Sequence, residues 1–307
     1  MKCGFRHIIF SFTSALFLLG TACSPSSGPA PVTDGALMAN LAEKHVKLGS
    51  RYSGSAGAEK AALWILEQCH KMNPKLKVSL LSFEEQTVSG KVKFHNVLAS
   101  SGTEKKDFVL IAAHFDTKYF PPEVPFQGAN DGASGVAALL GMMKALQNKS
   151  LPMDVVFAFF DGEEARYDYG KMDGLHGSRH LAEKWKAAGT LKHCKAMILL
   201  DMIGDKDLNI TLSWDTDNRL RHLLFSVADK MSLRNHVGDF NGTILDDHIP
   251  FQDKGIPCID LIDFQYGPEN SYWHTSEDTL DKISGASMKI AADLALALYW
   301  QIAGGAL

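Results

Sequence analysis

Long apolar runs and segments with helical periodicity alternate along most of the chain. Unbroken apolar runs are typical of strands buried on both faces of a sheet, and they occur over 107–113, 154–160, 196–200 and 258–262. Apolar positions at helical spacing predict helices over 33–48, 54–72, 133–146, 177–188 and 284–302. Two further strands are predicted over 78–83 and 91–98. This order favours an α/β fold, a three-layer α/β/α arrangement around a central, mostly parallel twisted sheet.

The first thirty residues have a different pattern. Lys2 and Arg6 precede an apolar run over 8–20, and its thirteen residues are too few for a helix that crosses a bilayer, which needs roughly 20. A positive start followed by such a run is typical of a cleaved export signal. The run ends at Cys23, and the next residues, 24–31, are rich in Ser, Pro and Gly.

This ending resembles a bacterial lipoprotein signal, although Gly20 stands where such signals usually have Leu. The resemblance implies that Cys23 is acylated and becomes the first residue of the mature chain. We therefore expect a signal peptide over 1–22, a lipid-anchored tether over 23–32 and a single domain over 33–307. The expected location is the periplasm, with anchorage in the outer membrane through Cys23. Plain secretion, with Cys23 unmodified, is the alternative.

Charge and cysteine content narrow the possibilities further. The chain of 307 residues has 31 basic and 35 acidic residues, a net charge of −4, and loss of residues 1–22 would make it −6. There is no basic excess to neutralise phosphates, so nucleic acid is not an expected partner. Three cysteines remain in the expected mature domain, Cys69, Cys194 and Cys258, without a CxxC pair. They are predicted to be small buried side chains, with one disulfide as the alternative.

Polar residues that can bind metal follow the predicted strands. In open α/β sheets, ligands bind beyond the carboxyl ends of the strands, so residues at those positions are expected to converge. They are His114 and Asp116 after 107–113, Glu163 and Glu164 after 154–160, Asp201 after 196–200, His274 in the loop after 258–262, and Asp131 just before the helix over 133–146. Histidine and carboxylates without thiolates suit zinc, and a catalytic zinc site keeps one coordination position open.

The two adjacent glutamates, Glu163 and Glu164, suit two different chemical roles. In an extended segment, neighbouring side chains point to opposite sides. One of Glu163 and Glu164 can therefore bind a metal while the other faces a substrate as a proton carrier.

These residues, in this order, resemble the zinc-dependent aminopeptidases with a doubly wound sheet. Local sequence words resemble one branch more closely, the glutaminyl-peptide cyclotransferases, also called glutaminyl cyclases. The words are FFDGEEA (159–165), GSRHLA (177–182), LLDMIG (199–204), DDHIPF (246–251) and WHT (273–275). The resemblance covers about 36–303 and implies a zinc exopeptidase-like fold with a single zinc-dependent catalytic domain.

The resemblance also implies roles for particular residues. One zinc ion would be held by Asp131, Glu164 and His274, with Glu163 as the general acid and base. An acidic network around Glu163 would come from Asp201 and Asp246, where the choice of Asp246 over Asp247 depends on the alignment within DDHIPF. The substrate pocket would be walled by Trp273 and by Tyr169, which stands where animal cyclases have a second Trp. The loop over 264–272 is longer than in those enzymes, so preference beyond the first substrate residue is left open.

The implied reaction converts N-terminal glutamine of peptides and proteins to pyroglutamate, with release of ammonia. A zinc aminopeptidase is the main alternative. In that enzyme His114 and Asp201 would bind a second metal ion and Asp131 would bridge the two. A non-enzymatic surface lipoprotein is a third possibility, but it predicts the loss of a metal ligand or of Glu163, and none is lost.

Overall fold

The computed structural model describes residue 1 and residues 32–102 and 106–307. The predicted signal peptide, Cys23 and nearly all of the predicted tether lie outside the described residues. The strands are β1 (Lys77–Thr87), β2 (Gly90–Ser100), β3 (Phe108–His114), β4 (Asp154–Phe160), β5 (Cys194–Asp201), β6 (Ile210–Leu212), β7 (Val237–Asp239) and β8 (Cys258–Ile262). The α-helices are α1 (Gly35–Val46), α2 (Ala56–Met72), α3 (Ala133–Leu146), α4 (His176–Ala188), α5 (Asn218–Lys230), α6 (Ile249–Gln252) and α7 (Gly285–Ala303).

One sheet of eight strands organises the described part of the chain. Its order is β1-β2-β4-β3-β5-β8-β6-β7. The central strands β4, β3, β5 and β8 are mutually parallel, whereas β2 pairs antiparallel with β4, and β6 antiparallel with β8. The predicted α/β class with a mostly parallel sheet is therefore confirmed, and the four apolar runs of the sequence are its central strands.

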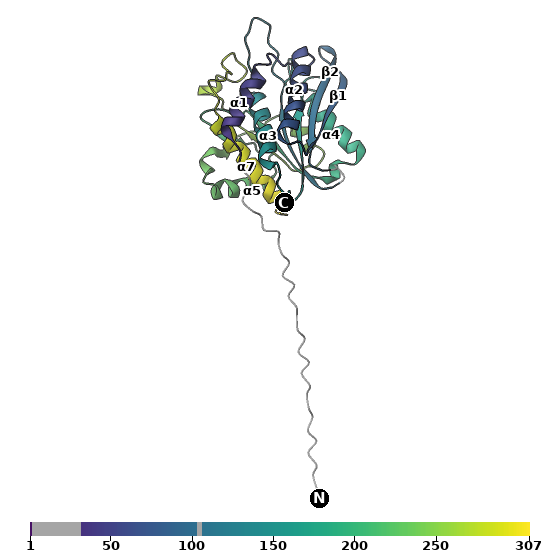
Figure 1. Ribbon diagram of the computed structural model, residues 1–307, viewed down its shortest axis with the longest axis vertical. Helices are drawn as coiled ribbons and strands as arrows, with labels where there is room; N and C mark the ends of the chain where they lie inside the picture. Colours follow the sequence, from purple (N-terminus) through teal and green to yellow (C-terminus); the bar gives the residue numbers. More distant parts are fainter. Residues whose placement is uncertain (2–31, 103–105) are drawn as a thin grey trace.

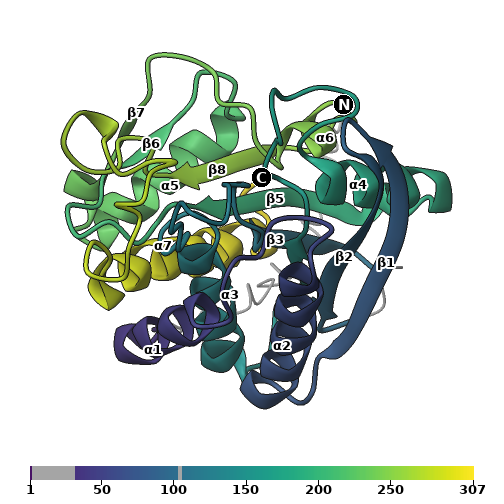
Figure 2. The same ribbon diagram turned by 90° about the horizontal axis from the view of Figure 1, so that it is seen from above.

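Helices cover both faces of this sheet. Figure 2 shows α1, α2, α3 and α7 on one side, and α4 and α6 on the other. The larger apolar core lies on the first side, where Leu220 and Leu224 of α5 also pack with the residues of α3 and α7. The smaller core contains Trp185 of α4 and Phe251 of α6. Burial on both faces explains why the central strands are apolar throughout and do not alternate.

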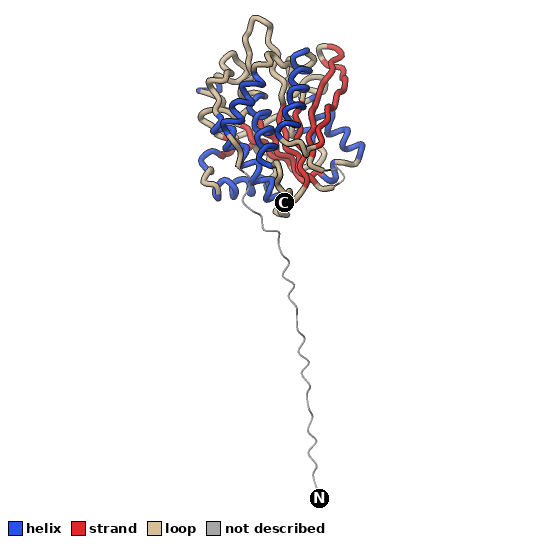
Figure 3. Tube along the Cα trace, viewed as in Figure 1, coloured by secondary structure: helices blue, strands red, loops and turns tan. Residues whose placement is uncertain are grey.

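Loops that follow the central strands gather at one end of the molecule, the upper end in Figures 1 and 3. The turn before α3 illustrates the close packing there. Gly132 has φ 91°, and a Cβ at this position would lie 2.7 Å from the carbonyl oxygen of Asp116. Only glycine fits such a position without strain, so this turn brings the residues before α3 against the end of β3.

The structure also contains elements that the sequence pattern did not predict. Both β6 and β7 have only three residues, too few to show a period. The helix α5 is capped by Asp217, whose carboxylate accepts hydrogen bonds from the amides of Arg219 and Leu220.

The three cysteines Cys69, Cys194 and Cys258 are buried free thiols, so the alternative of a disulfide among them is wrong. Among the described residues, no helix has the length and apolar character needed to span a membrane.

Candidate active site

Three of the predicted ligands converge at the loop end of the sheet. The Nε2 atom of His274 lies 3.2 Å from Oδ2 of Asp131 and 3.2 Å from Oε1 of Glu164. Ligand atoms about 2.0–2.1 Å from a tetrahedral zinc ion are separated by about 3.3 Å, so these spacings fit such an ion. Among the described residues, the buried oxygens Asp131 Oδ2 and Glu164 Oε2 have no hydrogen-bond donor, as expected of oxygens that can bind a cation. The donor set thus fits zinc.

Asp278 fixes the segment that carries Asp131. Its buried carboxylate accepts hydrogen bonds from the backbone amides of Asn130, at 2.7 Å, and of Asp131, at 3.1 Å. It also accepts one from the hydroxyl of Tyr266 at 3.0 Å. The sequence analysis did not identify Asp278. The only signal was its position four residues after His274 in the same loop.

Asp116 does the same for the segment that carries the two glutamates. Its carboxylate accepts hydrogen bonds from the backbone amides of Glu163 and Glu164, both at 3.2 Å. Lys118 adds a further contact, because its Nζ donates to the carbonyl of Ala165 at 2.6 Å and lies 3.5 Å from Oε2 of Glu164. Asp131 and Glu164 therefore project from backbone segments that buried carboxylates hold in place.

A cavity of about 620 Å³ opens beside these ligands. Seven residues that the sequence analysis selected line it together: Asp131, Glu163, Tyr169, Asp201, Asp246, Trp273 and His274. Sequence reasoning missed six other lining residues, Met202, Thr243, Ile244, Leu245, Ile262 and Phe264. Most of these are apolar side chains in loops, where no periodic pattern could mark them. Of the two acids in DDHIPF, Asp246 lies in the cavity wall, and Asp247 is not among its lining residues.

Glu163 is buried in this cavity and contacts one of the predicted pocket residues. The hydroxyl of Tyr169 donates to its Oε1 at 2.9 Å. Burial, and then the charge of Glu164, raise the pKa of Glu163 well above its ordinary value. A cation bound at Glu164 would lower this pKa again. A carboxyl whose pKa lies between the value raised by burial and the value lowered by a cation can accept and return a proton near neutrality.

Behind Asp246 lies a group of buried polar side chains. The carboxylates of Asp246 and Asp260 and the imidazole of His248 each offer an atom within 4.8 Å of the others. Within the described part of the chain, both carboxylate oxygens of Asp260 and both ring nitrogens of His248 have no hydrogen-bond partner. Burial, and then neighbouring carboxylates, raise the pKa of Asp246 and of Asp260 well above the usual range. This side of the cavity therefore favours protonated carboxyl groups.

A second group of candidate ligands shares Asp131 with the first. The Nε2 atom of His114 lies 3.2 Å from Oδ1 of Asp131 and 3.0 Å from Oδ1 of Asp201. The arrangement that a two-metal aminopeptidase would need is thus present as well. Ligand geometry by itself does not separate the two enzymes.

The sequence and the fold match known proteins. The sequence profile described as peptidase family M28 matches residues 96–299. The chain belongs to this family. Within it, the chain is 32% identical over 236 residues to a glutaminyl-peptide cyclotransferase of Drosophila melanogaster, an alignment that covers 68% of this chain and 66% of the relative. The chain thus spans about two thirds of the length of that relative.

Solved structures agree with the sequence match. The crystal structure of a glutaminyl cyclase from an Acidobacteriales bacterium has a TM-score of 0.81 and 34% identity, covering 90% of this chain and 96% of that one. A zinc-dependent exopeptidase from Parabacteroides distasonis has a TM-score of 0.78 at 22% identity, covering 88% and 99%, and shares the fold. The resemblance to glutaminyl cyclases inferred from the sequence words is confirmed.

Proposed function

We propose that this protein is a glutaminyl-peptide cyclotransferase that converts the N-terminal glutamine of peptides to pyroglutamate. One observation carries the proposal: a single cavity contains the convergent Asp131 and His274, the proton carrier Glu163 and the wall residue Trp273. The relatives that share this family and a third of the sequence are named glutaminyl cyclases.

The reaction can be assigned to groups in the cavity. The α-amine of the substrate attacks the side-chain amide carbon of the same glutamine, a new C–N bond closes the ring, and the amide nitrogen leaves as ammonia. Zinc held by Asp131, Glu164 and His274 would act as a Lewis acid on the amide carbonyl. Glu163 takes a proton from the attacking amine and returns it to the departing nitrogen. Asp201 and Asp246, in the same cavity wall, complete the acidic surroundings of Glu163.

The apolar side chains of the cavity support cyclisation over hydrolysis. Trp273 packs against Phe264 with ring centroids 5.4 Å apart, and Met202 and Ile262 are nearly fully buried beside them. A wall of this kind limits access of water, which would otherwise convert glutamine to glutamate. We expect pyroglutamate, and not N-terminal glutamate, as the main product.

One assay separates this function from the aminopeptidase that the second ligand group would allow. The purified protein is given a peptide with N-terminal glutamine, with ammonia release as readout, and in parallel a leucine amide, with free leucine as readout. We expect ammonia from the first and no leucine from the second. Cleavage of the leucine amide alone would contradict the proposal. Zinc content gives a second readout, about one ion per chain for the cyclase and about two for the aminopeptidase.

We also propose that the protein is exported and anchored to a membrane by a lipid on Cys23, on the sequence pattern described above. Exported proteins with N-terminal glutamine would then be its natural substrates. Mass spectrometry of the mature N-terminus tests this directly. The expected result is a diacylglycerol-modified Cys23 as first residue, and an unmodified mature N-terminus would support plain secretion.

A further inference from the structure

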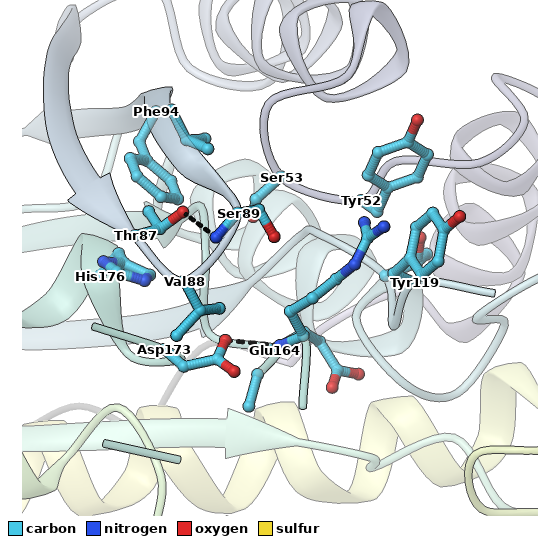
Figure 4. A pocket seen from close by; sticks show the side chains of 14 residues that line it. Tyr52, Ser53, Thr87, Val88, Ser89, Phe94, Tyr119, Glu164, Asp173 and His176 are labelled. Carbon is cyan, nitrogen blue, oxygen red and sulfur yellow. Dashed lines mark hydrogen bonds between the residues drawn. The ribbon is translucent and has the colours of Figure 1, made fainter. Parts of the chain in front are cut away.

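In the described part of the chain, a second cavity shares no lining residue with the catalytic one, although the proposed zinc ligand Glu164 lies in its wall. It has a volume of about 450 Å³ and lies between the tip of the β1–β2 hairpin and the segment that follows Glu164. We call it the hairpin pocket, lined among others by Tyr52, Thr87, Ser89, Tyr119, Arg166 and His176. In Figure 4, Tyr52 and Tyr119 lie side by side at one end, and Phe94 and His176 at the other.

Arg166 places a positive charge in the wall of this pocket. Its guanidinium carbon lies 3.1 Å from the ring centroid of Tyr119 and 6.0 Å from that of Tyr52. The side chain is half-buried. Among the described residues, no carboxylate lies within 4.0 Å of the guanidinium, and it donates no hydrogen bond to a protein group. A stacked guanidinium keeps its donors free in the ring plane, where they can meet a planar anion.

The acids that line the pocket are already engaged elsewhere. The carboxylate of Asp173 accepts hydrogen bonds from the backbone amides of Arg166, Tyr167 and Asp168. Glu164 faces His274 and Lys118. Neither carboxylate forms an ion pair with Arg166, so its guanidinium donors remain available to a bound ligand. A carboxylate is the natural partner, because it accepts two parallel hydrogen bonds from a guanidinium.

The position of Arg166 suggests where that carboxylate comes from. Arg166 follows Glu164 by two residues, so their Cα atoms are at most about 7 Å apart. A peptide whose first residue occupies the catalytic cavity extends by about 3.3 Å for each further residue. A carboxylate on the third residue is therefore within reach of an arginine side chain at this position.

We propose that the hairpin pocket is a substrate subsite in which Arg166 binds a carboxylate carried by the third residue of the peptide. The source is an acidic side chain or the C-terminal carboxylate of a tripeptide. The inference rests on the proposed cyclase function and names the substrates that this site prefers. Lys118, which binds the carbonyl of Ala165, holds the segment between the two cavities and fixes the distance from the catalytic groups to Arg166.

The test compares three peptides that differ in the third residue: Gln-Ala-Glu-amide, Gln-Ala-Gln-amide and Gln-Ala-Gln with a free carboxylate. We expect kcat/KM to be about 10-fold higher for the peptide with a side-chain or terminal carboxylate that reaches Arg166, because KM falls and kcat stays the same. The two acidic peptides distinguish the side chain from the terminus. Salt should reduce the preference, since the pocket is partly open to solvent.

Variants at two positions decide whether Arg166 is responsible. Arg166→Gln should bring the ratio between acidic and neutral peptides to about one, and Arg166→Lys should retain part of it. The matched control is Lys171→Gln, which removes an exposed positive charge from the same segment but not from the pocket wall. It should leave the ratio unchanged. Equal use of all three peptides by the wild type, or a preference that survives Arg166→Gln, would overturn the inference.

Failure of the cyclase function would be recognised separately. In that case no peptide with N-terminal glutamine releases ammonia. The pocket is then tested by equilibrium binding of peptides, measured as a change in tryptophan fluorescence. The peptides pyroGlu-Ala-Glu-amide and pyroGlu-Ala-Gln-amide serve as probes. Tighter binding of the acidic probe to the wild type but not to Arg166→Gln supports the pocket, and equal binding of the two probes contradicts it.

Discussion

Two groups of side chains at the cavity differ in how their carboxylates are partnered. The metal side contains Asp131, Glu164 and His274, and the acidic side contains Asp246 and Asp260. On the metal side, the backbone of the ligand-bearing segments is fixed by hydrogen bonds to buried carboxylates. On the acidic side, both oxygens of Asp260 and both nitrogens of His248 lack a hydrogen-bond partner among the described residues. The unpartnered oxygens of the metal side, Asp131 Oδ2 and Glu164 Oε2, instead face His274 and Lys118. The carboxylates of both sides are buried, so burial alone does not explain the difference.

The difference follows from what each side has to do. Ligands that are positioned before the ion arrives bind it with little loss of conformational freedom, which is why the supporting hydrogen bonds matter on the metal side. Carboxyl groups that take part in proton transfer need pKa values near the working pH, and burial among like charges raises them. The metal side is thus built for fixed geometry and the acidic side for a variable proton count.

The largest expected effect comes from replacing Glu163 while the residues of the metal side are kept intact. Glu163→Gln removes the proton carrier but keeps the shape of the side chain. Turnover should fall by about 10³-fold or more, while zinc content remains unchanged, because the ligands Asp131, Glu164 and His274 are intact. Ammonia release and metal analysis of the same preparation test both points. Full turnover, or loss of zinc, would contradict the assigned role.

Next in size is the loss of a ligand on the metal side. His274→Ala should weaken zinc binding by more than about 100-fold, more than the loss of a supporting residue does. Competition with a chromophoric chelator measures the affinity. His222→Ala removes an exposed imidazole from α5 and serves as control. Unchanged affinity in His274→Ala would mean that the ion is held elsewhere.

A smaller effect is expected from the support of Asp131. Asp278→Ala removes the acceptor for the amides of Asn130 and Asp131, and zinc affinity should fall by about 10- to 100-fold. Asp278→Asn, which keeps one acceptor oxygen, should lie between this variant and the wild type. The exposed Asp281 of the same segment provides the control Asp281→Ala. If Asp278→Ala binds zinc as tightly as the wild type, the positioning role is wrong.

The smallest effect concerns stability on the acidic side. Burial, and then the charge of Asp201, raise the pKa of Asp260 well above its unfolded value of about 3.9. The folded state then holds a proton that the unfolded state has lost, so the free energy of unfolding decreases as the pH rises above about 4 toward the folded pKa. Asp260→Asn cannot lose this proton and should lessen that decrease by on the order of 1 kcal/mol.

Urea unfolding of the zinc-loaded protein at pH 5 and pH 8 measures this difference. The control is Asp229→Asn, an exposed position on α5 that should follow the wild type. An identical pH dependence in Asp260→Asn and the wild type would show that Asp260 does not hold the proton.

The sequence predicted the fold and four cavity residues, Asp131, Glu163, Asp201 and His274, because strand ends are easy to find. The other three, Tyr169, Asp246 and Trp273, came only from the resemblance to glutaminyl cyclases. Unbroken apolar runs such as 107–113 mark buried parallel strands, and the residues just after them are expected to converge. This reasoning predicted that His114, Glu163 and Asp201 lie at one end of the sheet, as they do in the structure. It could not predict Asp278 or Asp260, because their roles depend on which backbone amide or side chain lies opposite them in space. Nor could it predict Arg166, since a charge in a loop shows nothing about its neighbours.

The contact between Asp278 and the backbone of Asp131 joins positions that are 147 residues apart in the sequence. A contact of such long range costs loop-closure entropy before it stabilises the fold, so we expect it to form late in folding. We therefore expect the proposed zinc site to be completed only when the last parts of the sheet and its loops have come together. Uptake of the metal ion should then follow the slowest folding step, and its rate would report how quickly newly made molecules mature.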